Sequence, residues 1–184
     1  MLERLKNWVL NIFTRKKYKL LKNVYIIHDG RKLYQIKALK SFGFIKKGTI
    51  GGYIESENNF SPFGDSWIYD NAKVYGNAYV GNNAKVYSNA QLYGNAIVYG
   101  NAYVSGNAEV YGNAEIQCHK DYIVFKNFWS SGRYFTWTRS NNMWKVGCFF
   151  GTGEELITKA YDDSPEKGKY YELFVNFVKD KLNN

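Results

Sequence analysis

A six-residue repeat in the middle of the chain constrains its fold more than any other feature. Aliphatic side chains recur at a strict interval of six, at Ile68, Val74, Val80, Val86, Leu92, Val98, Val104, Val110 and Ile116. An alanine follows four positions after all but the last, at Ala72, Ala78, Ala84, Ala90, Ala96, Ala102, Ala108 and Ala114. Six residues supply one short strand and one corner, so three such units close one coil. The repeat therefore predicts a parallel β-helix over residues 67–118.

The corners of these coils carry the residue types that sharp turns need. Five corners hold a Gly-Asn pair, at Gly76-Asn77, Gly94-Asn95, Gly100-Asn101, Gly106-Asn107 and Gly112-Asn113. Glycine and asparagine tolerate positive φ better than other residues. The alanines must point inward, where a larger side chain would collide with its counterparts in neighbouring coils. We therefore expect leucine at Ala90 or Ala96 to disrupt the stack.

Two segments precede the repeat. Residues 1–22 carry seven Lys and Arg against Glu3, and apolar side chains at Leu2, Leu5, Val9, Ile12 and Phe13 predict an amphipathic helix over residues 2–22. This helix either packs on its own assembly or docks on a partner, a membrane surface or nucleic acid. Within residues 23–66 the spacing predicts a β-hairpin that turns at Asp29-Gly30, followed by an irregular first coil over residues 41–66.

After residue 118 the period stops and a small α+β domain is expected over residues 119–184. The pattern predicts strands over residues 122–128, 133–138 and 143–149, then helices over residues 154–161 and 165–182. Thr152 and Glu155 form a capping box for the first helix. This domain would cover the end of the β-helix.

Composition supports a mainly β protein and excludes several other classes. Aromatic residues make up 18% of the 184 residues against only two prolines, and aromatic side chains favour strands. Cys118 and Cys148 lie far apart without a metal-binding pattern, so neither a disulfide framework nor a metal site is predicted. The apolar run over residues 8–13 is too short for an export signal or a membrane span, which predicts a soluble, cytoplasmic protein.

The repeat resembles the hexapeptide transferase superfamily. Its members are typically left-handed β-helix trimers, many of which are acyltransferases that use acetyl-CoA or similar donors. Residues 47–57 (KGTIGGYIESE) and 67–72 (WIYDNA) are similar to hexapeptide-repeat proteins of bacteria and their phages. Residues 134–163 are similar to a segment that follows the repeat in phage members. The resemblance implies left-handed coils, a homotrimer and a bacterial or phage origin.

Superfamily acyltransferases commonly use a histidine as general base, which the resemblance would assign to one of two residues. His28 sits beside the hairpin turn and His119 sits where the repeat ends, so neither is expected in the coil array. We therefore predict no catalytic residue and no cofactor. An acyl-CoA-dependent O- or N-acyltransferase, with acyl-CoA as its cofactor, is the alternative.

Aromatic residues suggest two ligand-binding surfaces. Tyr75, Tyr93 and Tyr111 are eighteen residues apart and so align on one face, where they suit either subunit packing or a planar ligand. In the C-terminal domain, basic and aromatic residues interleave on two strands, at Arg133, Trp137, Arg139, Trp144 and Lys145. They suit a nucleotide base and phosphate or single-stranded nucleic acid. The alternative is that the tryptophans belong to the core and the arginines to its solvated rim.

These features favour a non-catalytic binding protein. We expect a trimeric scaffold that holds a small anionic, nucleotide-like ligand or a host protein. The resemblance to phage proteins extends this expectation to counter-defence by sequestration. A third hypothesis is a structural scaffold that residues 1–22 anchor to a membrane surface or to nucleic acid.

Overall fold

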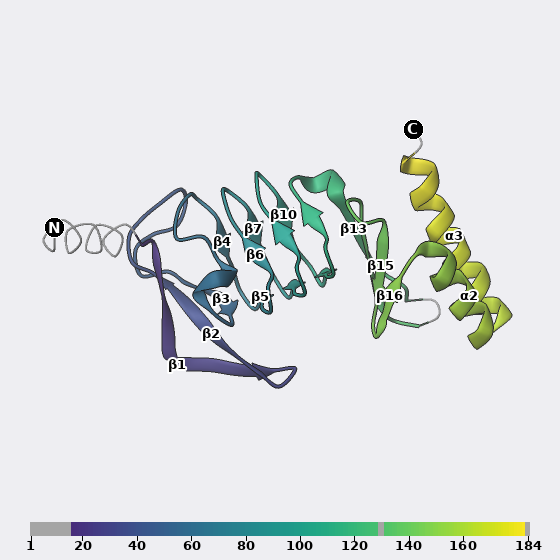
Figure 1. Ribbon diagram of the computed structural model, residues 1–184, viewed down its shortest axis with the longest axis horizontal. Helices are drawn as coiled ribbons and strands as arrows, with labels where there is room; N and C mark the ends of the chain where they lie inside the picture. The colour runs from purple at the N-terminus through teal and green to yellow at the C-terminus, as the bar shows by residue number, and fades with distance from the viewer. Residues whose placement is uncertain (1–15, 129–130, 183–184) are drawn as a thin grey trace, which may run out of the picture.

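The structure is a computed structural model that describes residues 16–128 and 131–182. Figure 1 shows an elongated molecule, with a hairpin at one end, a stack of coils in the middle, and a small domain of strands and two helices at the other end. The predicted parallel β-helix is confirmed as a β-solenoid of about four turns of parallel strands.

Each unit of the repeat forms one short strand and one corner. The strands are β4 (Trp67–Ile68), β5 (Lys73–Val74), β6 (Tyr79–Val80), β7 (Lys85–Val86), β8 (Gln91–Leu92), β9 (Ile97–Val98), β10 (Tyr103–Val104), β11 (Glu109–Val110) and β12 (Glu115–Ile116). Every third strand pairs in parallel, which gives three sheets: β4-β7-β10, β6-β9-β12 and β5-β8-β11. The last of these continues through β3 (Ile50–Ile54) into the hairpin.

The interior of the solenoid follows the sequence pattern. The aliphatic side chain of every unit and all the repeat alanines are fully buried, with 0% of their surface exposed. The glycine of each Gly-Asn corner has positive φ, as at Gly76 (φ 65°). Where a corner lacks this glycine, Asp70, Asn82 or Ser88 takes the left-handed conformation instead. Local turn chemistry and core packing therefore specify the same coil.

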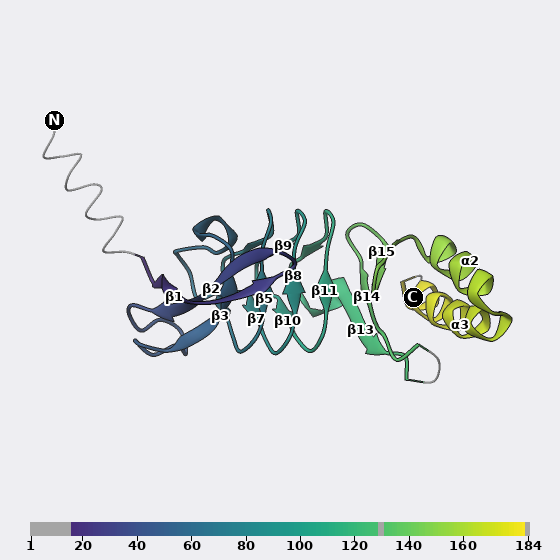
Figure 2. The same ribbon diagram turned by 90° about the horizontal axis from the view of Figure 1, so that it is seen from below.

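The hairpin is longer than the sequence indicates. It consists of β1 (Tyr18–His28) and β2 (Arg31–Ala38), joined by Asp29 and Gly30, which both have positive φ as a tight hairpin turn requires. The predicted helix over residues 2–22 is therefore wrong at its end, since residues 18–22 belong to β1; residues 2–15 lie outside the described part of the chain. Figure 2 shows the hairpin lying along the coils.

The N-terminal end of the solenoid is closed by hydrogen-bond donors. Between coils, N–H groups donate to carbonyls of the following coil, as Trp67 does to Ala84 (3.1 Å). The first coil thus presents carbonyls that no earlier coil can serve. The buried Lys17 ammonium lies 2.9 Å from the Ser66 carbonyl, which occupies the place of Ala84 one coil earlier. It also donates to the Ser66 hydroxyl and to the carbonyls of Phe63 and Gly64.

The C-terminal end is closed by acceptors, as this polarity demands. The N–H groups of Glu109 and Glu115 donate to the Thr136 and Ser140 hydroxyls at 3.0 and 2.7 Å. Asp121 Oδ2 accepts from the N–H groups of residues 117 and 118, at 2.8 Å each. Burial raises the pKa of Asp121, but these backbone donors outweigh it, so the pKa lies below its usual value. Residues of the C-terminal domain thus cover this end of the solenoid, and they do so through hydrogen bonds to individual N–H groups.

The C-terminal domain packs a four-stranded antiparallel sheet against two helices. Its elements are β13 (Tyr122–Lys126), β14 (Tyr134–Thr138), β15 (Met143–Val146), β16 (Phe149–Gly151), α2 (Gly153–Asp163) and α3 (Pro165–Leu182). Two short 3-10 helices, η1 (Glu57–Asn59) and η2 (His119–Asp121), precede these elements in the chain. The predicted strand over residues 143–149 divides in two because the chain turns at Gly147 (φ 55°). The capping box of Thr152 and Glu155 at α2 is confirmed.

Candidate functional site

The outer face of the sheet β5-β8-β11 presents two columns of side chains. One column is Lys73, Gln91 and Glu109, and the other is Tyr75, Tyr93 and Tyr111. The hairpin tip lies on this face: His28 Nε2 is 2.8 Å from Gln91 Oε1, and the Tyr75 hydroxyl donates to Asp29 Oδ2 at 3.2 Å. The face therefore holds two separate hollows, which we call the tyrosine groove and the basic cleft.

The tyrosine groove has a volume of about 510 Å³ and lies beside the second column. Its walls are the three column tyrosines, Asp29 and Arg31 of the hairpin, and the corner asparagines Asn77 and Asn95. The predicted alignment of the tyrosines is confirmed, with ring centroids 5.1 Å apart for Tyr75–Tyr93 and 4.6 Å for Tyr93–Tyr111. Because the rings cover each other's faces, mainly their edges are open to a ligand.

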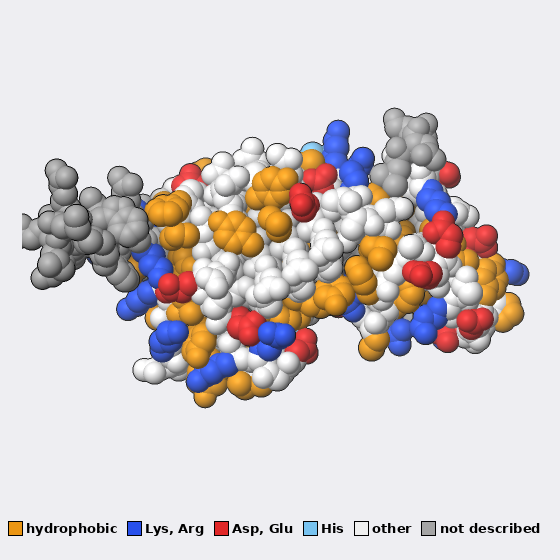
Figure 3. All heavy atoms as spheres, in the orientation of Figure 1, with side chains coloured by type: hydrophobic (Ala, Val, Ile, Leu, Met, Phe, Trp, Pro, Cys, Tyr) orange, Lys and Arg blue, Asp and Glu red, His pale blue; other side chains and the backbone are white. Residues whose placement is uncertain are grey.

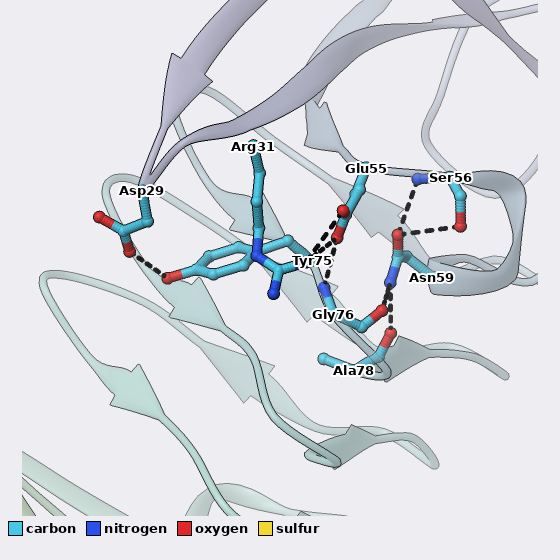
Figure 4. Close-up of polar contacts among 8 residues, drawn as sticks. All are labelled: Asp29, Arg31, Glu55, Ser56, Asn59, Tyr75, Gly76 and Ala78. Atoms are coloured by element: carbon cyan, nitrogen blue, oxygen red, sulfur yellow. Dashed lines mark hydrogen bonds and ion pairs between the residues drawn. The ribbon is translucent and has the colours of Figure 1, made fainter.

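Charges in the tyrosine groove are already engaged. Figure 4 shows that Arg31 pairs with Glu55, whose carboxylate also accepts from the N–H of Gly76 at 2.7 Å. The side-chain amide of Asn59 donates to the carbonyls of Gly76 and Ala78, which fixes the same corner. An anion in this groove would have to compete with Glu55 for Arg31. The tyrosine groove is consequently a poor site for an anionic ligand.

Two of the three column tyrosines, Tyr75 and Tyr93, have raised pKa values. Burial is the largest cause for both Tyr75 and Tyr93, and the neighbouring carboxylates of Asp29 and Glu109 add to it. A phenol whose pKa is higher in the folded chain contributes stability that is present below its unfolded pKa of about 10 and is lost as the pH rises above it.

An alkaline titration should therefore show two phases. A solvent-exposed phenol ionises gradually around its ordinary pKa of about 10, whereas Tyr75 and Tyr93 should ionise in a steep step together with unfolding, because the folded chain resists their charge. Tyrosinate absorbance and circular dichroism, recorded in parallel, measure the two processes. Ionisation of all 17 tyrosines before any loss of β structure would contradict this prediction.

The basic cleft lies where the solenoid meets the C-terminal sheet. It has a volume of about 400 Å³ and is lined by Lys73, Asn89, Asn107 and Glu109 of the solenoid and by Arg133 and Tyr134 at the start of β14. The last coil is tied to β14 by the Thr136 cap, which brings Arg133 over the first column. Residues more than fifty positions apart in the sequence thus share one cleft.

The cleft has a positive charge balance. Its carboxylate, Glu109, lies 3.3 Å from the Lys145 ammonium and accepts a hydrogen bond from Tyr93, so its charge is compensated. Within residues 16–128 and 131–182, neither Lys73 nor Arg133 forms an ion pair. Two cations therefore face the cleft without a carboxylate partner.

Neutral groups complete the cleft. Asn89 and Asn107 occupy equivalent corners of successive coils, and each carries an amide that can donate and accept. The half-covered ring of Tyr134 offers a planar surface, and the Lys126 ammonium lies 5.8 Å from its centroid. Such a combination suits a small molecule that has an anionic group and a planar or polar part.

The structure brings together some of the predicted site residues and separates others. Arg133 lines the basic cleft and Lys145 adjoins it, whereas Arg139 is elsewhere and donates to the carbonyl of Lys120. Trp137 and Trp144 are only 1% and 2% exposed and belong to the core of the C-terminal domain. They cannot present a stacking surface, because α3 covers that side of the sheet through residues such as Tyr171 and Val175.

The two histidines differ in position. His119 is exposed in η2, as expected. His28 was expected outside the coil array but lies on it, against Gln91 and edge-on to Tyr75 with ring centroids 5.3 Å apart. The sequence pattern does not single out Lys73, Asn89 and Asn107, which also line the cleft. Eighteen-residue spacing aligns Lys73 with Gln91 and Glu109, and it aligns Asn89 with Asn107 at the neighbouring corner. Nothing in the sequence shows, however, that β14 lies beside them.

No helix in the described part of the chain combines the length and the hydrophobicity that crossing a bilayer requires. No protein-family model matches the sequence, and a search of curated proteins finds no similar chain.

Proposed function

We propose that this chain is a non-catalytic binding protein that holds a small anionic, nucleotide-like ligand in the basic cleft. The observation that carries the proposal is that Lys73 and Arg133 face the same cleft without carboxylate partners in the described residues. Cations that lack a carboxylate partner attract anions, and arginine favours phosphate and carboxylate groups in particular.

The neutral lining of the cleft narrows the ligand class. A phosphate would lie between Lys73 and Arg133, while a base or another planar group would rest near Tyr134. The amides of Asn89 and Asn107 supply donors and acceptors that fit sugar hydroxyls or base edges. The cleft volume of about 400 Å³ suits a mononucleotide better than a polymer.

The remaining features of the proposal rest on the resemblance to hexapeptide-repeat proteins. They are left-handed winding of the coils, assembly as a homotrimer, and a role in counter-defence in which a nucleotide signal is sequestered. A host protein that contacts the same face is the alternative occupant.

Titration calorimetry with adenosine monophosphate and with inorganic phosphate tests the proposal. The nucleotide should bind, and Arg133→Ala or Lys73→Ala should weaken its binding about tenfold or more, because each variant removes a charged contact. Arg139→Ala is the matched control, since this arginine lies outside the cleft and should leave the Kd unchanged. Equal affinity in all four proteins, or no binding of either anion, would refute the proposal.

One observation favours a second candidate, acyl transfer from an acyl-CoA donor. His28 lies on the coil array between the two hollows, where a general base would have access to a bound acceptor. Its Nε2 atom is, however, engaged by Gln91. If this candidate is correct, acetyl-CoA is turned over and His28→Ala abolishes turnover while acetyl-CoA still binds.

A further inference from the structure

The positive charge of the chain is concentrated in residues 16–47, which comprise the hairpin and the segments on either side of it. Residues 16–47 hold ten Lys and Arg side chains and a single carboxylate, Asp29, so this segment has a net charge of +9, equal to that of the whole chain. Figure 3 shows these basic side chains over the hairpin and the N-terminal end of the solenoid, with hydrophobic side chains between them. The basic segment over residues 2–22 is predicted from its sequence to be a helix. Its residues 18–22 belong instead to the first strand of this basic hairpin.

Five residues of the hairpin form one surface, which we call the hairpin face: Lys22, Tyr25, Ile27, Lys32 and Tyr34. Tyr25 pairs across the hairpin with Tyr34, and Ile27 pairs with Lys32, so these four side chains share a side. The ammonium groups of Lys32 and Lys22 lie over the rings of Tyr25 and Tyr34, at 3.8 and 4.6 Å. Ile27 is 67% exposed, which is unusual for an isoleucine in a strand.

The arrangement of charges is unfavourable in the isolated protein. The ammonium groups of Lys22 and Lys32 both lie over the ring of Tyr34, at 4.6 and 5.5 Å from its centroid, and like charges gathered on one face repel each other. Nearby carboxylates are engaged elsewhere: Glu55 pairs with Arg31, Glu57 with Lys16, and Asp29 accepts from Tyr75. An extended anionic surface would relieve this repulsion.

We infer that the hairpin face docks on the surface of an anionic lipid bilayer. Each lysine near such a surface adds to the electrostatic attraction, and exposed apolar side chains are stabilised by entering the headgroup region. Tyr25 and Ile27, exposed by 47% and 67%, supply the apolar contacts. A nucleic acid fits less well, because aliphatic side chains do not stack on bases and Lys32 already covers one face of Tyr25.

Cosedimentation with vesicles tests this inference on the full chain. Vesicles of phosphatidylcholine with phosphatidylserine should bind the protein, vesicles of phosphatidylcholine alone should not, and added salt should release it. The double variant Lys22→Glu/Lys32→Glu should lose at least 90% of the binding. Ile27→Ser should weaken binding about threefold to tenfold without changing the charge.

A matched control makes the same charge change elsewhere. Lys120→Glu/Lys169→Glu alters two exposed lysines outside the hairpin and should keep most of the binding. Circular dichroism verifies that each variant is folded. Equal loss in both double variants, or equal binding to neutral vesicles, would overturn the inference. Tighter binding to single-stranded RNA that the hairpin variants abolish would assign the face to nucleic acid and overturn it as well.

The bilayer contact and the cleft are separable. Arg133→Ala should bind anionic vesicles as the unaltered protein does, and the hairpin variants should keep the affinity of the cleft for adenosine monophosphate.

Discussion

Replacing Ala90 with leucine should destabilise the solenoid by about 3 kcal/mol or more, the upper part of the range for overpacked cores. Ala90 is fully buried, and Ala72 and Ala108 occupy the equivalent places in the coils on either side of it. A larger side chain there must push adjacent coils apart, which stretches the hydrogen bonds that join them. Urea unfolding followed by circular dichroism measures the change.

Ser105→Leu is the control for added bulk. Ser105 lies at an exposed position of the same coil array, so leucine there increases the volume outside the coil rather than inside it. Its free energy of unfolding should change by about 0.5 kcal/mol or less. An Ala90→Leu protein with an unaltered urea midpoint would show that the alanine does not set the coil spacing.

Lys17→Met should cost about 3–5 kcal/mol, as removal of one partner from a buried charged network typically does. The ammonium contacts three backbone carbonyls and the Ser66 hydroxyl at the open end of the first coil. Methionine fills the space but leaves these oxygens without donors. Lys19→Met, at an exposed position of the adjoining strand β1, should have little effect.

The pH dependence provides a second readout for Lys17. Burial lowers its pKa to about 7, with Asp65 opposing the shift and Lys40 adding to it. The unfolded chain binds the proton of the Lys17 ammonium group more tightly than the folded chain does. The contribution of Lys17 to stability therefore falls as the pH drops from about 10 to 7 and is constant below that range. This slope should be missing in Lys17→Met. If the stability of both proteins depends on pH with the same slope between about pH 7 and 10, the lowered pKa is not that of Lys17.

The solenoid was predictable because its information is local and periodic. A six-residue period fixes which side chains face inward, and an eighteen-residue coil then aligns Tyr75, Tyr93 and Tyr111 by arithmetic alone. The hairpin turn at Asp29-Gly30 is equally local. The helix predicted over residues 2–22 fails at its end because residues 18–20 pair with residues 36–38 of β2, a contact that the local apolar spacing does not show.

The candidate site depends on long-range packing that no short pattern encodes. Strand alternation places Arg133, Trp137 and Arg139 on one side of β14 but does not show that α3 buries the tryptophan. Likewise, Lys73 and Arg133 line one cleft because β14 is joined to the last coil, for example through the hydrogen bond from Glu109 to Thr136. Docking of the two parts of the chain therefore creates the basic cleft.

Native mass spectrometry of the protein purified without added ligand tests the proposed binding function most directly. We expect extra mass of mononucleotide size on the unaltered protein, and its loss from the Lys73→Ala/Arg133→Ala variant. The same spectrum reports the number of subunits, for which we propose three. A folded protein that carries no extra mass and takes up none from a nucleotide mixture, or extra mass that persists in the double variant, would contradict the assignment of the cleft.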